Sequence, residues 1–163
     1  MTLPTNALDK TDIEILRILQ ENGRLPVVEL AKRVNLTTTP CSERVKRLER
    51  EGYISGYRAE LSAEKLGFEV VVFIHIRLDQ TNFSIFEKFA LAAELMPEIE
   101  ECYSLSGDFD TMIKVRVKNI KQYQHFMSVK LAQLPGIIQT RSEIVIDEHK
   151  RGHGLNPDLL SAG

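Results

Sequence analysis

Basic side chains are concentrated between positions 32 and 50, where only two acidic residues, Glu43 and Glu49, accompany them. This segment has a local charge of +4 in a chain of 163 residues whose formal net charge is −2. Clustered cations attract phosphate, and nearby hydroxyl groups can hydrogen-bond to phosphate oxygens or base edges. The segment therefore has the chemistry of a nucleic-acid contact: its cations are Lys32, Arg33, Arg44, Lys46, Arg47 and Arg50, and its hydroxyls include Thr37, Thr38 and Thr39.

Helical spacing of apolar residues predicts two short helices before this segment and a third within it. The first helix begins at an Asp9 cap and ends at Asn22 and Gly23, where we expect a left-handed C-terminal cap. The second begins at Pro26 and ends at Asn35, a residue type that tolerates a positive φ. A hydroxyl cap in the threonine run starts the third helix, which ends near position 52.

One side of the third helix is apolar and the other is polar and basic. Cys41, Val45 and Leu48 share a stripe that faces the first two helices, so packing accounts for the cysteine. A helix of about 14 residues fits the major groove, and three short helices with a basic third one make a helix-turn-helix. The alternative is a packing module with solvated charges. Candidates nearest base edges are Ser42, Lys46 and Arg47, with Arg44 and Arg50 nearer phosphate.

The second half of the chain changes from helical to alternating periodicity. Strands are predicted at 70–78, 99–105, 111–117 and 137–146, with helices before the second and fourth strands. Met96–Ile99 matches Leu134–Ile137 at a shift of 38 residues, which indicates two repeated βαβ units in one antiparallel sheet with both helices on one face. The fold class is therefore α+β, and we expect a second copy to cover the helix-free face.

Three other features invite chemical interpretations. The acidic turn Ser106–Asp110 could bind a cation or an ammonium group, or could be an ordinary hairpin turn. His149 and His153 have the spacing of metal ligands on a helix, but two cations and a glycine between them favour a loose tail. Cys41 and Cys102 lie too far apart in sequence for a zinc knuckle or a CxxC motif, so no metal site is expected.

The sequence contains none of the motifs that mark common enzymes, namely GxSxG, P-loop, GxGxxG and HExxH, so no catalysis and no cofactor are expected. Its apolar runs are far shorter than the ~18–20 residues of a membrane helix. We therefore expect a cytoplasmic protein with no membrane partner.

The chain resembles the leucine-responsive regulatory protein/AsnC family of feast/famine transcription regulators over most of positions 8–148. The resemblance is carried by Leu8–Leu16, by Thr39–Cys41 with Glu43–Val45 and Arg47–Glu49, and by Ser106–Asp110. It implies four regions: a winged helix-turn-helix domain at 1–52, a hinge strand and linker at 53–68, a ferredoxin-like βαββαβ domain at 69–149, and a tail at 150–163.

The resemblance also implies function. We expect a sequence-specific regulator that binds double-stranded DNA, forms dimers that assemble to octamers, and binds a small amino acid between dimers. Two alternatives remain: an amino-acid-sensing regulatory subunit of an enzyme, or an architectural protein that compacts DNA. The residues that the family places at the effector site are Ser104, Gly107, Asp108, Asp110 and, on the last strand, Glu143.

Overall fold

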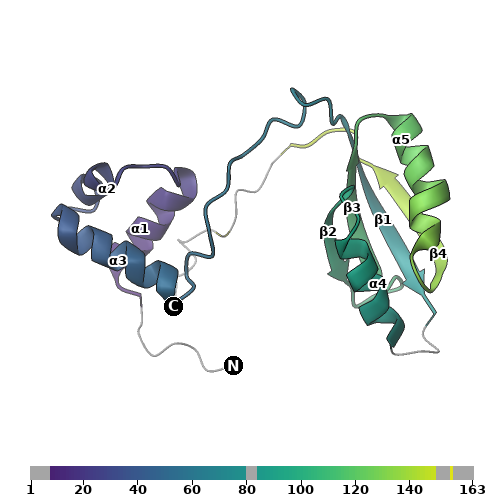
Figure 1. Ribbon diagram of the computed structural model, residues 1–163, viewed down its shortest axis with the longest axis horizontal. Coiled ribbons are helices and arrows are strands. Elements are labelled where there is room, and N and C mark those ends of the chain that lie inside the picture. The colour runs from purple at the N-terminus through teal and green to yellow at the C-terminus, as the bar shows by residue number, and fades with distance from the viewer. Residues whose placement is uncertain (1–7, 80–83, 150–154, 156–163) are drawn as a thin grey trace. The chain divides into compact units, whose positions relative to one another are not determined.

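The computed structural model describes residues 8–79, 84–149 and 155, and these form two compact units that divide between Glu60 and Leu61. The N-terminal unit contains three helices, and the C-terminal unit contains a four-stranded antiparallel sheet with helices on one face (Figure 1). Both halves of the α+β prediction are therefore confirmed. No helix in the described residues has the length and apolar character needed to cross a bilayer.

The N-terminal unit consists of α1 (Lys10–Glu21), α2 (Val27–Arg33) and α3 (Thr38–Arg50) around one small core. Cys41 and Leu48 of α3 are fully buried in it, as their spacing predicts. Burial raises the pKa of the Cys41 thiol, so this cysteine acts as a small apolar side chain. The unit is held together by apolar packing between α3 and the two preceding helices.

The helix ends in this unit agree only partly with the sequence predictions. Asp9 caps α1 in a reciprocal arrangement with Asp12, and Asn35 has the predicted positive φ of 55°. The left-handed cap expected at Asn22 is wrong, since its φ is −144° and Gly23 is not in the left-handed region either. Thr37 precedes α3, but its hydroxyl makes no capping bond, and its backbone carbonyl instead accepts the amide of Cys41 at 3.2 Å.

The segment after α3 is not the predicted strand. Residues 53–69 are all described, and none of them pairs with a strand of this chain. Tyr53 and Ile54 pack on the helical core instead, and the Tyr57 hydroxyl donates a hydrogen bond to the carboxylate of Glu49 at 2.9 Å. The start of the predicted hinge segment is therefore held against α3 by side chains.

The Tyr57 bond predicts a titration at high pH. Burial and the hydrogen bond to Glu49 raise the pKa of the Tyr57 phenol to about 12. Its contribution to stability is therefore complete below about pH 10, the ordinary pKa of tyrosine, and is lost as the pH rises through the folded value. Ultraviolet titration of phenolate should show a late component that Tyr57→Phe removes. If Tyr57→Phe instead removes a component that titrates near the ordinary pKa of tyrosine, the contact between Tyr57 and Glu49 is contradicted.

The C-terminal unit contains every predicted strand and helix. Its elements are β1 (Val70–Leu78), α4 (Ser84–Glu94), β2 (Ile99–Ser104), β3 (Thr111–Val117), α5 (Ile120–His125) and β4 (Ile137–Ile144). The strand order is β2-β3-β1-β4, with every neighbouring pair antiparallel. The internal repeat is visible, because β2 and β4 begin at the matched isoleucines Ile99 and Ile137. The spacing of Phe83, Phe86 and Phe89 predicts that the first helix of this unit includes Phe83, but that residue lies outside the described residues.

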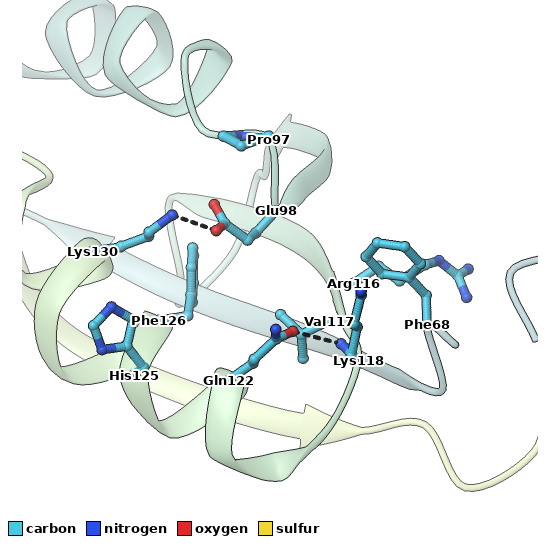
Figure 2. A pocket seen from close by; sticks show the side chains of 10 residues that line it. All are labelled: Phe68, Pro97, Glu98, Arg116, Val117, Lys118, Gln122, His125, Phe126 and Lys130. Carbon is cyan, nitrogen blue, oxygen red and sulfur yellow. Dashed lines mark hydrogen bonds and ion pairs between the residues drawn. The ribbon is translucent and has the colours of Figure 1, made fainter. Parts of the chain in front are cut away.

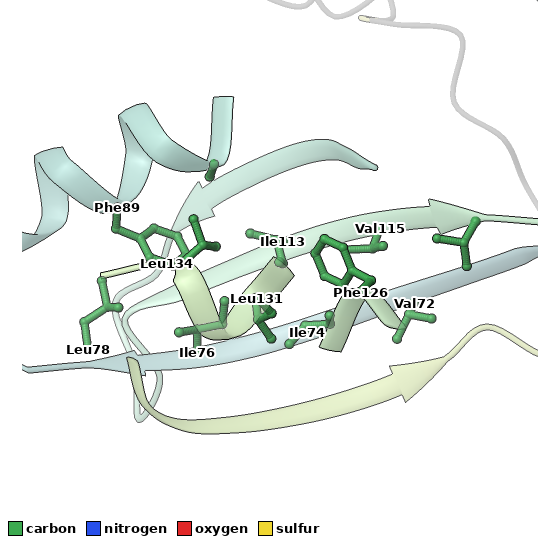
Figure 3. Close-up of a cluster of buried hydrophobic side chains, with 12 residues drawn as sticks. Val72, Ile74, Ile76, Leu78, Phe89, Ile113, Val115, Phe126, Leu131 and Leu134 are labelled. Atoms are coloured by element: carbon green, nitrogen blue, oxygen red, sulfur yellow. The ribbon is translucent and has the colours of Figure 1, made fainter. Parts of the chain in front are cut away.

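Both helices cover the same face of the sheet (Figure 3). Alternate residues of β1 and β3 point to this face, and Phe89 of α4 and Phe126 after α5 pack onto them. The helix after α5 is irregular: a π-helical turn, η1 (Phe126–Lys130), and a 3₁₀ turn, η2 (Leu131–Gln133), replace its predicted continuation. These turns bring Leu131 and Leu134 into the core.

The opposite face of the sheet is less apolar than expected. Val71, Phe73 and Met112 lie there, but ion pairs occupy much of the rest. Lys114 of β3 lies 3.3 Å from the Glu100 carboxylate and 3.0 Å from that of Glu101. The helix-free face is therefore a mixed surface of apolar and charged groups.

Candidate DNA interface and effector site

The outward side of α3 exposes Thr39, Glu43, Lys46 and Arg50, which recur at intervals of four, three and four residues. They lie opposite the buried side of the helix, so they form one continuous stripe, hereafter the outward stripe. Neither Lys46 nor Arg50 has an ion-pair partner in the described part of the chain. The outward stripe is thus free to bind a partner with both cations.

The two other arginines of α3 are bound by carboxylates at the start of α1. Arg44 Nη1 lies 2.6 Å from Asp9 Oδ2 and 2.8 Å from Asp12 Oδ1. Arg47 Nη2 lies 2.6 Å from Asp12 Oδ2. Asp12 is 1% exposed, whereas the side chains of Arg44 and Arg47 are 32% and 24% exposed. We call these four residues the α1–α3 clamp.

The contacts of the clamp shift the pKa values of Arg44, Arg47 and Asp9 in the directions that favour their charged forms. Hydrogen bonds to Asp9 and then Asp12 raise the pKa of Arg44, and the bond to Asp12 raises that of Arg47. Burial works to raise the pKa of Asp9, but the Asp12 amide and Arg44 outweigh it and hold that pKa below its usual value. Charged hydrogen bonds of this kind fix side-chain positions as well as adding stability. The sequence analysis predicts that Arg47 lies near the base edges of DNA. In the structure its guanidinium group instead pairs with Asp12 of α1.

The sequence analysis did not predict the clamp, because its carboxylates and arginines are 32 to 35 positions apart in the chain. The local pattern assigns Asp9 and Asp12 only to the cap of α1, which the structure confirms. The one available signal is matched spacing: Asp9 and Asp12 are three residues apart on their helix, as are Arg44 and Arg47 on theirs. Such a coincidence indicates a contact only after the helices are placed.

In the C-terminal unit, the acidic turn between β2 and β3 carries three of the five predicted effector residues. Gly107 and Asp108 are exposed, and Asp110 is half-buried. Asp110 Oδ2 accepts the Leu78 amide at 2.8 Å, and the Asp110 amide donates to the Ile76 carbonyl at 3.0 Å. Asp110 therefore anchors the turn to the end of β1.

The remaining predicted residues lie at different distances from this turn. Ser104 is the last residue of β2 and pairs with Thr111, so it borders the turn directly. Glu143 of β4 lies opposite Phe73, four positions along β1 from Arg77 at the turn. Its carboxylate nevertheless lies 3.1 Å from Arg141 and 3.7 Å from His75. Both of these side chains lie beside Phe109 of the turn, so Glu143 is linked to the turn through them.

An aromatic residue of the turn, missed in the sequence, organises the surrounding charges. The ring centre of Phe109 lies 5.4 Å from the Arg77 guanidinium carbon, 5.2 Å from that of Arg141 and 5.7 Å from the His75 ring. Arg77 Nε also donates to the Asp108 carbonyl at 3.0 Å. Two guanidinium groups therefore hold the acidic turn against the sheet, and cation–π contacts contribute to this.

Comparison with known proteins assigns a family to each unit of the chain. Residues 8–55 match the family described as winged helix-turn-helix DNA-binding, and residues 71–155 match the Lrp/AsnC ligand binding domain. The chain is 43% identical over 152 residues to the leucine-responsive regulatory protein of Escherichia coli K12, covering 93% of each chain. His153, the partner in the possible histidine pair, lies outside the described residues.

Solved structures show the same architecture. A transcriptional regulator of Neisseria meningitidis, solved as a complex with L-Met, is 35% identical with a TM-score of 0.90, over 94% of this chain and 99% of that one. AsnC of E. coli is 28% identical with a TM-score of 0.82, over 90% and 97% of the two chains. With its winged helix-turn-helix DNA-binding domain and its ligand-binding domain, the chain belongs to the Lrp/AsnC family of transcription regulators.

Proposed function

We propose that the outward stripe of α3 enters the major groove of double-stranded DNA and reads its sequence. The observation that carries this proposal is that Lys46 and Arg50 lie exposed on the side of α3 opposite its buried residues and have no carboxylate partner among the described residues. Ser42 and Lys46 lie toward base edges, while Arg50 and the hydroxyls of Thr37, Thr38 and Thr39 contact phosphate or base edges at the helix ends.

The composition of the stripe favours sequence reading over indiscriminate binding. Glu43 lies between the cations on the same stripe, and a carboxylate there repels phosphate but can accept a hydrogen bond from cytosine. A surface used only to compact DNA gains nothing from an acid at its centre. The architectural alternative is therefore less consistent with the stripe.

Arg44 and Arg47 act in this proposal as positioning residues. Their guanidinium groups fix the angle between α1 and α3, so that the stripe is presented in one orientation. In this proposal the chain acts by binding rather than by catalysis, and it acts in the cytoplasm.

The test is a selection of duplexes from a random pool by the intact protein, followed by affinity measurements at physiological salt. A sequence-specific regulator should prefer the selected duplex over a scrambled one by about a thousandfold or more. Equal affinities for the two duplexes would instead support the architectural alternative, and no binding to either would support an enzyme-regulatory subunit.

We further propose that the β2–β3 turn binds a small amino acid where dimers of the chain meet, and that dimers assemble into octamers. The L-Met complex of the Neisseria relative supports an amino-acid ligand. Asp108 is exposed and so can receive the α-ammonium group, while Asp110 is occupied in holding the turn. Amides near Gly107 receive the α-carboxylate, Ser104 borders the site, and Glu143 lies behind Arg141 and His75 at its edge.

Asp108→Asn should weaken amino-acid binding by roughly tenfold or more, because a charge-assisted hydrogen bond contributes about 1.5–3 kcal/mol. A thermal-shift screen of the twenty amino acids identifies the ligand, and calorimetry then gives its affinity. Asp147→Asn, a substitution of an exposed carboxylate after β4, is the matched control. Equal affinities of the parent and Asp108→Asn would place the ammonium site elsewhere.

A further inference from the structure

Two aromatic side chains, Tyr57 and Phe68, hold opposite ends of the hinge segment that joins the two units. Tyr57 belongs to the N-terminal unit and Phe68 to the C-terminal unit. Neither residue is part of the outward stripe or of the acidic turn, so the proposed function gives no role to either. The contacts of each ring determine how much of the hinge segment is fixed to each unit.

Tyr57 fixes the start of the hinge segment to the helices of the N-terminal unit. Its ring lies against Gly23, just after α1, where a β-carbon would be 3.0 Å from Tyr57 Cδ1. Its hydroxyl donates to the carboxylate of Glu49 on α3 at 2.9 Å. Before it in the chain, the Ile54 amide donates to the Leu48 carbonyl at 3.2 Å. The segment up to Tyr57 is therefore held by both α1 and α3.

Phe68 fixes the other end of the hinge segment to the C-terminal unit. Its ring lines one end of a cavity of about 420 Å³, on the side where Figure 2 shows Lys118. The Lys118 ammonium lies 5.5 Å from the centre of that ring, within the range of a cation–π contact. The Phe68 amide donates to the Ala63 carbonyl at 2.8 Å, which closes a turn directly before β1. Residues 63–68 are therefore held close to the sheet.

The two aromatic contacts leave residues 58–62 between them, and we call this stretch the tether. An extended chain spans about 3.3–3.6 Å per residue, so the tether reaches at most about 18 Å. If the Tyr57 contact is lost, residues 55–57 are added to it, because Ile54 is still held by Leu48. The reach then increases by about 10 Å. The Tyr57 side chain therefore controls the length of the tether.

We propose that Tyr57 and Phe68, by fixing the length of the tether, determine the spacing of the two DNA half-sites that a dimer accepts. This inference rests on the proposed function, in which the outward stripe of each chain enters the major groove. Dimers with such recognition helices bind half-sites separated by a helical turn of about 34–36 Å. A short tether allows both stripes to bind at one separation, whereas a longer tether allows several. Both aromatic residues are positioning residues that do not contact DNA.

The lengths predict which changes in DNA a longer tether can accommodate. Release of residues 55–57 in both chains of a dimer adds about 20 Å of reach in total. Two inserted base pairs move the half-sites apart by about 7 Å and rotate them by about 70°. A full inserted turn moves them by about 34–36 Å, which exceeds the added reach. Loss of the Tyr57 contact should therefore restore binding after the short insertion only.

The test compares the selected duplex with duplexes that carry about two or ten additional base pairs between the half-sites. For the intact protein the short insertion should lower affinity about tenfold or more, because the two half-sites are no longer bound together. Tyr57→Ala and Phe68→Ala should each reduce this loss to about threefold or less. The loss on the long insertion should be unchanged. Leu61→Ala, which removes a side chain that is 66% exposed from the tether, is the control and should behave like the parent.

Two further variants distinguish the Tyr57 contact from a general loss of stability. Tyr57→Phe keeps the ring against Gly23 but loses the hydrogen bond, so its loss of affinity on the short insertion should lie between those of the parent and Tyr57→Ala. Glu49→Ala removes the same bond from the side of α3 and should match Tyr57→Phe. General destabilisation would lower affinity for all three duplexes equally, and such a result would overturn the proposal. Neither Tyr57 nor Phe68 belongs to a hydrophobic core, so the variants should fold.

The outcomes separate the tether from the proposed function. If the intact protein prefers the selected duplex over a scrambled one, but Tyr57→Ala or Phe68→Ala loses as much affinity on the short insertion as the parent, only the tether proposal is wrong. If the intact protein shows no preference for the selected duplex, the proposed function is wrong and the tether proposal is wrong with it.

Discussion

Replacing Asp12 with alanine is expected to lower the free energy of unfolding of the N-terminal unit by about 2–4 kcal/mol. Removing one partner of a buried ion pair costs about 3–5 kcal/mol, and the lower range allows for the partial exposure of both arginines. Asp12 is 1% exposed and contacts Arg44 and Arg47, so its loss leaves Arg47 without a carboxylate partner in the clamp and Arg44 with Asp9 alone. For a unit of this size the melting temperature should fall by about 10 °C or more.

The matched control for Asp12 is Glu14→Ala on the same helix. Glu14 lies 3.0 Å from Arg17, but both side chains are about two-fifths exposed, so this pair should contribute less than about 1 kcal/mol. Thermal unfolding followed by circular dichroism compares the two variants. Similar small shifts for both would show that the α1–α3 clamp does not hold the helices together.

The clamp variant should also bind DNA with less discrimination. Once Asp12 is removed, Arg47 is released and Arg44 is held by Asp9 alone, so both can reach phosphate more readily. Each new phosphate contact steepens the dependence of log affinity on log salt by about 0.9. Affinity for a scrambled duplex should rise relative to the selected one. The clamp is thus expected to support specificity by keeping two cations away from the DNA backbone.

Gly136→Ala should destabilise the C-terminal unit by about 2–5 kcal/mol. The glycine has a φ of 75°, which costs an L-residue about 1–2 kcal/mol, and a β-carbon there would lie 2.3 Å from Ile85 Cγ1. Displacing the Ile85 side chain, which packs against the core, adds about 1–3 kcal/mol. Gly136 sits just before β4, so both costs fall on the junction between the second helix and the last strand.

Gly67→Ala separates the two costs. Gly67 also has a φ of 75°, but nothing lies within 4 Å of the position that a β-carbon would occupy. Its substitution should therefore cost only the backbone contribution, about 1–2 kcal/mol. Chemical denaturation of both variants gives the comparison, and an equal loss at the two positions would mean that Ile85 moves aside without cost.

The fold could be predicted because its signals are local. The change from helical to alternating periodicity places all four strands of the sheet, and the repeat near Ile99 and Ile137 gives their pairing into βαβ units. The prediction failed where a side-chain contact, rather than the local pattern, determines the path of the backbone. Residues after Gly52 alternate like a strand, but Tyr57 is held by Glu49, and no strand of the same chain is there to pair with it.

The candidate sites were predictable in location but not in detail. Charge and spacing indicate which helix presents the cations, yet they cannot distinguish free cations from those already neutralised. Arg47 and Arg50 have the same chemistry in sequence, and only the packing of α1 against α3 pairs the first with Asp12. Similarly, the turn sequence contains two aspartates, and only the pairing of β1 with β3 shows that Asp110 accepts a hydrogen bond from the Leu78 amide.

A salt titration of duplex binding tests most directly whether the outward stripe of α3 contacts DNA. The intact protein and the Lys46→Ala/Arg50→Ala variant are titrated on the selected duplex, with Lys88→Ala/Lys121→Ala in the C-terminal unit as the charge-matched control. The stripe variant should lose about a hundredfold or more in affinity, and its salt slope should fall by about 0.9 or more for each bound helix. An unchanged affinity and slope, with the control behaving identically, would show that DNA binds elsewhere on the protein.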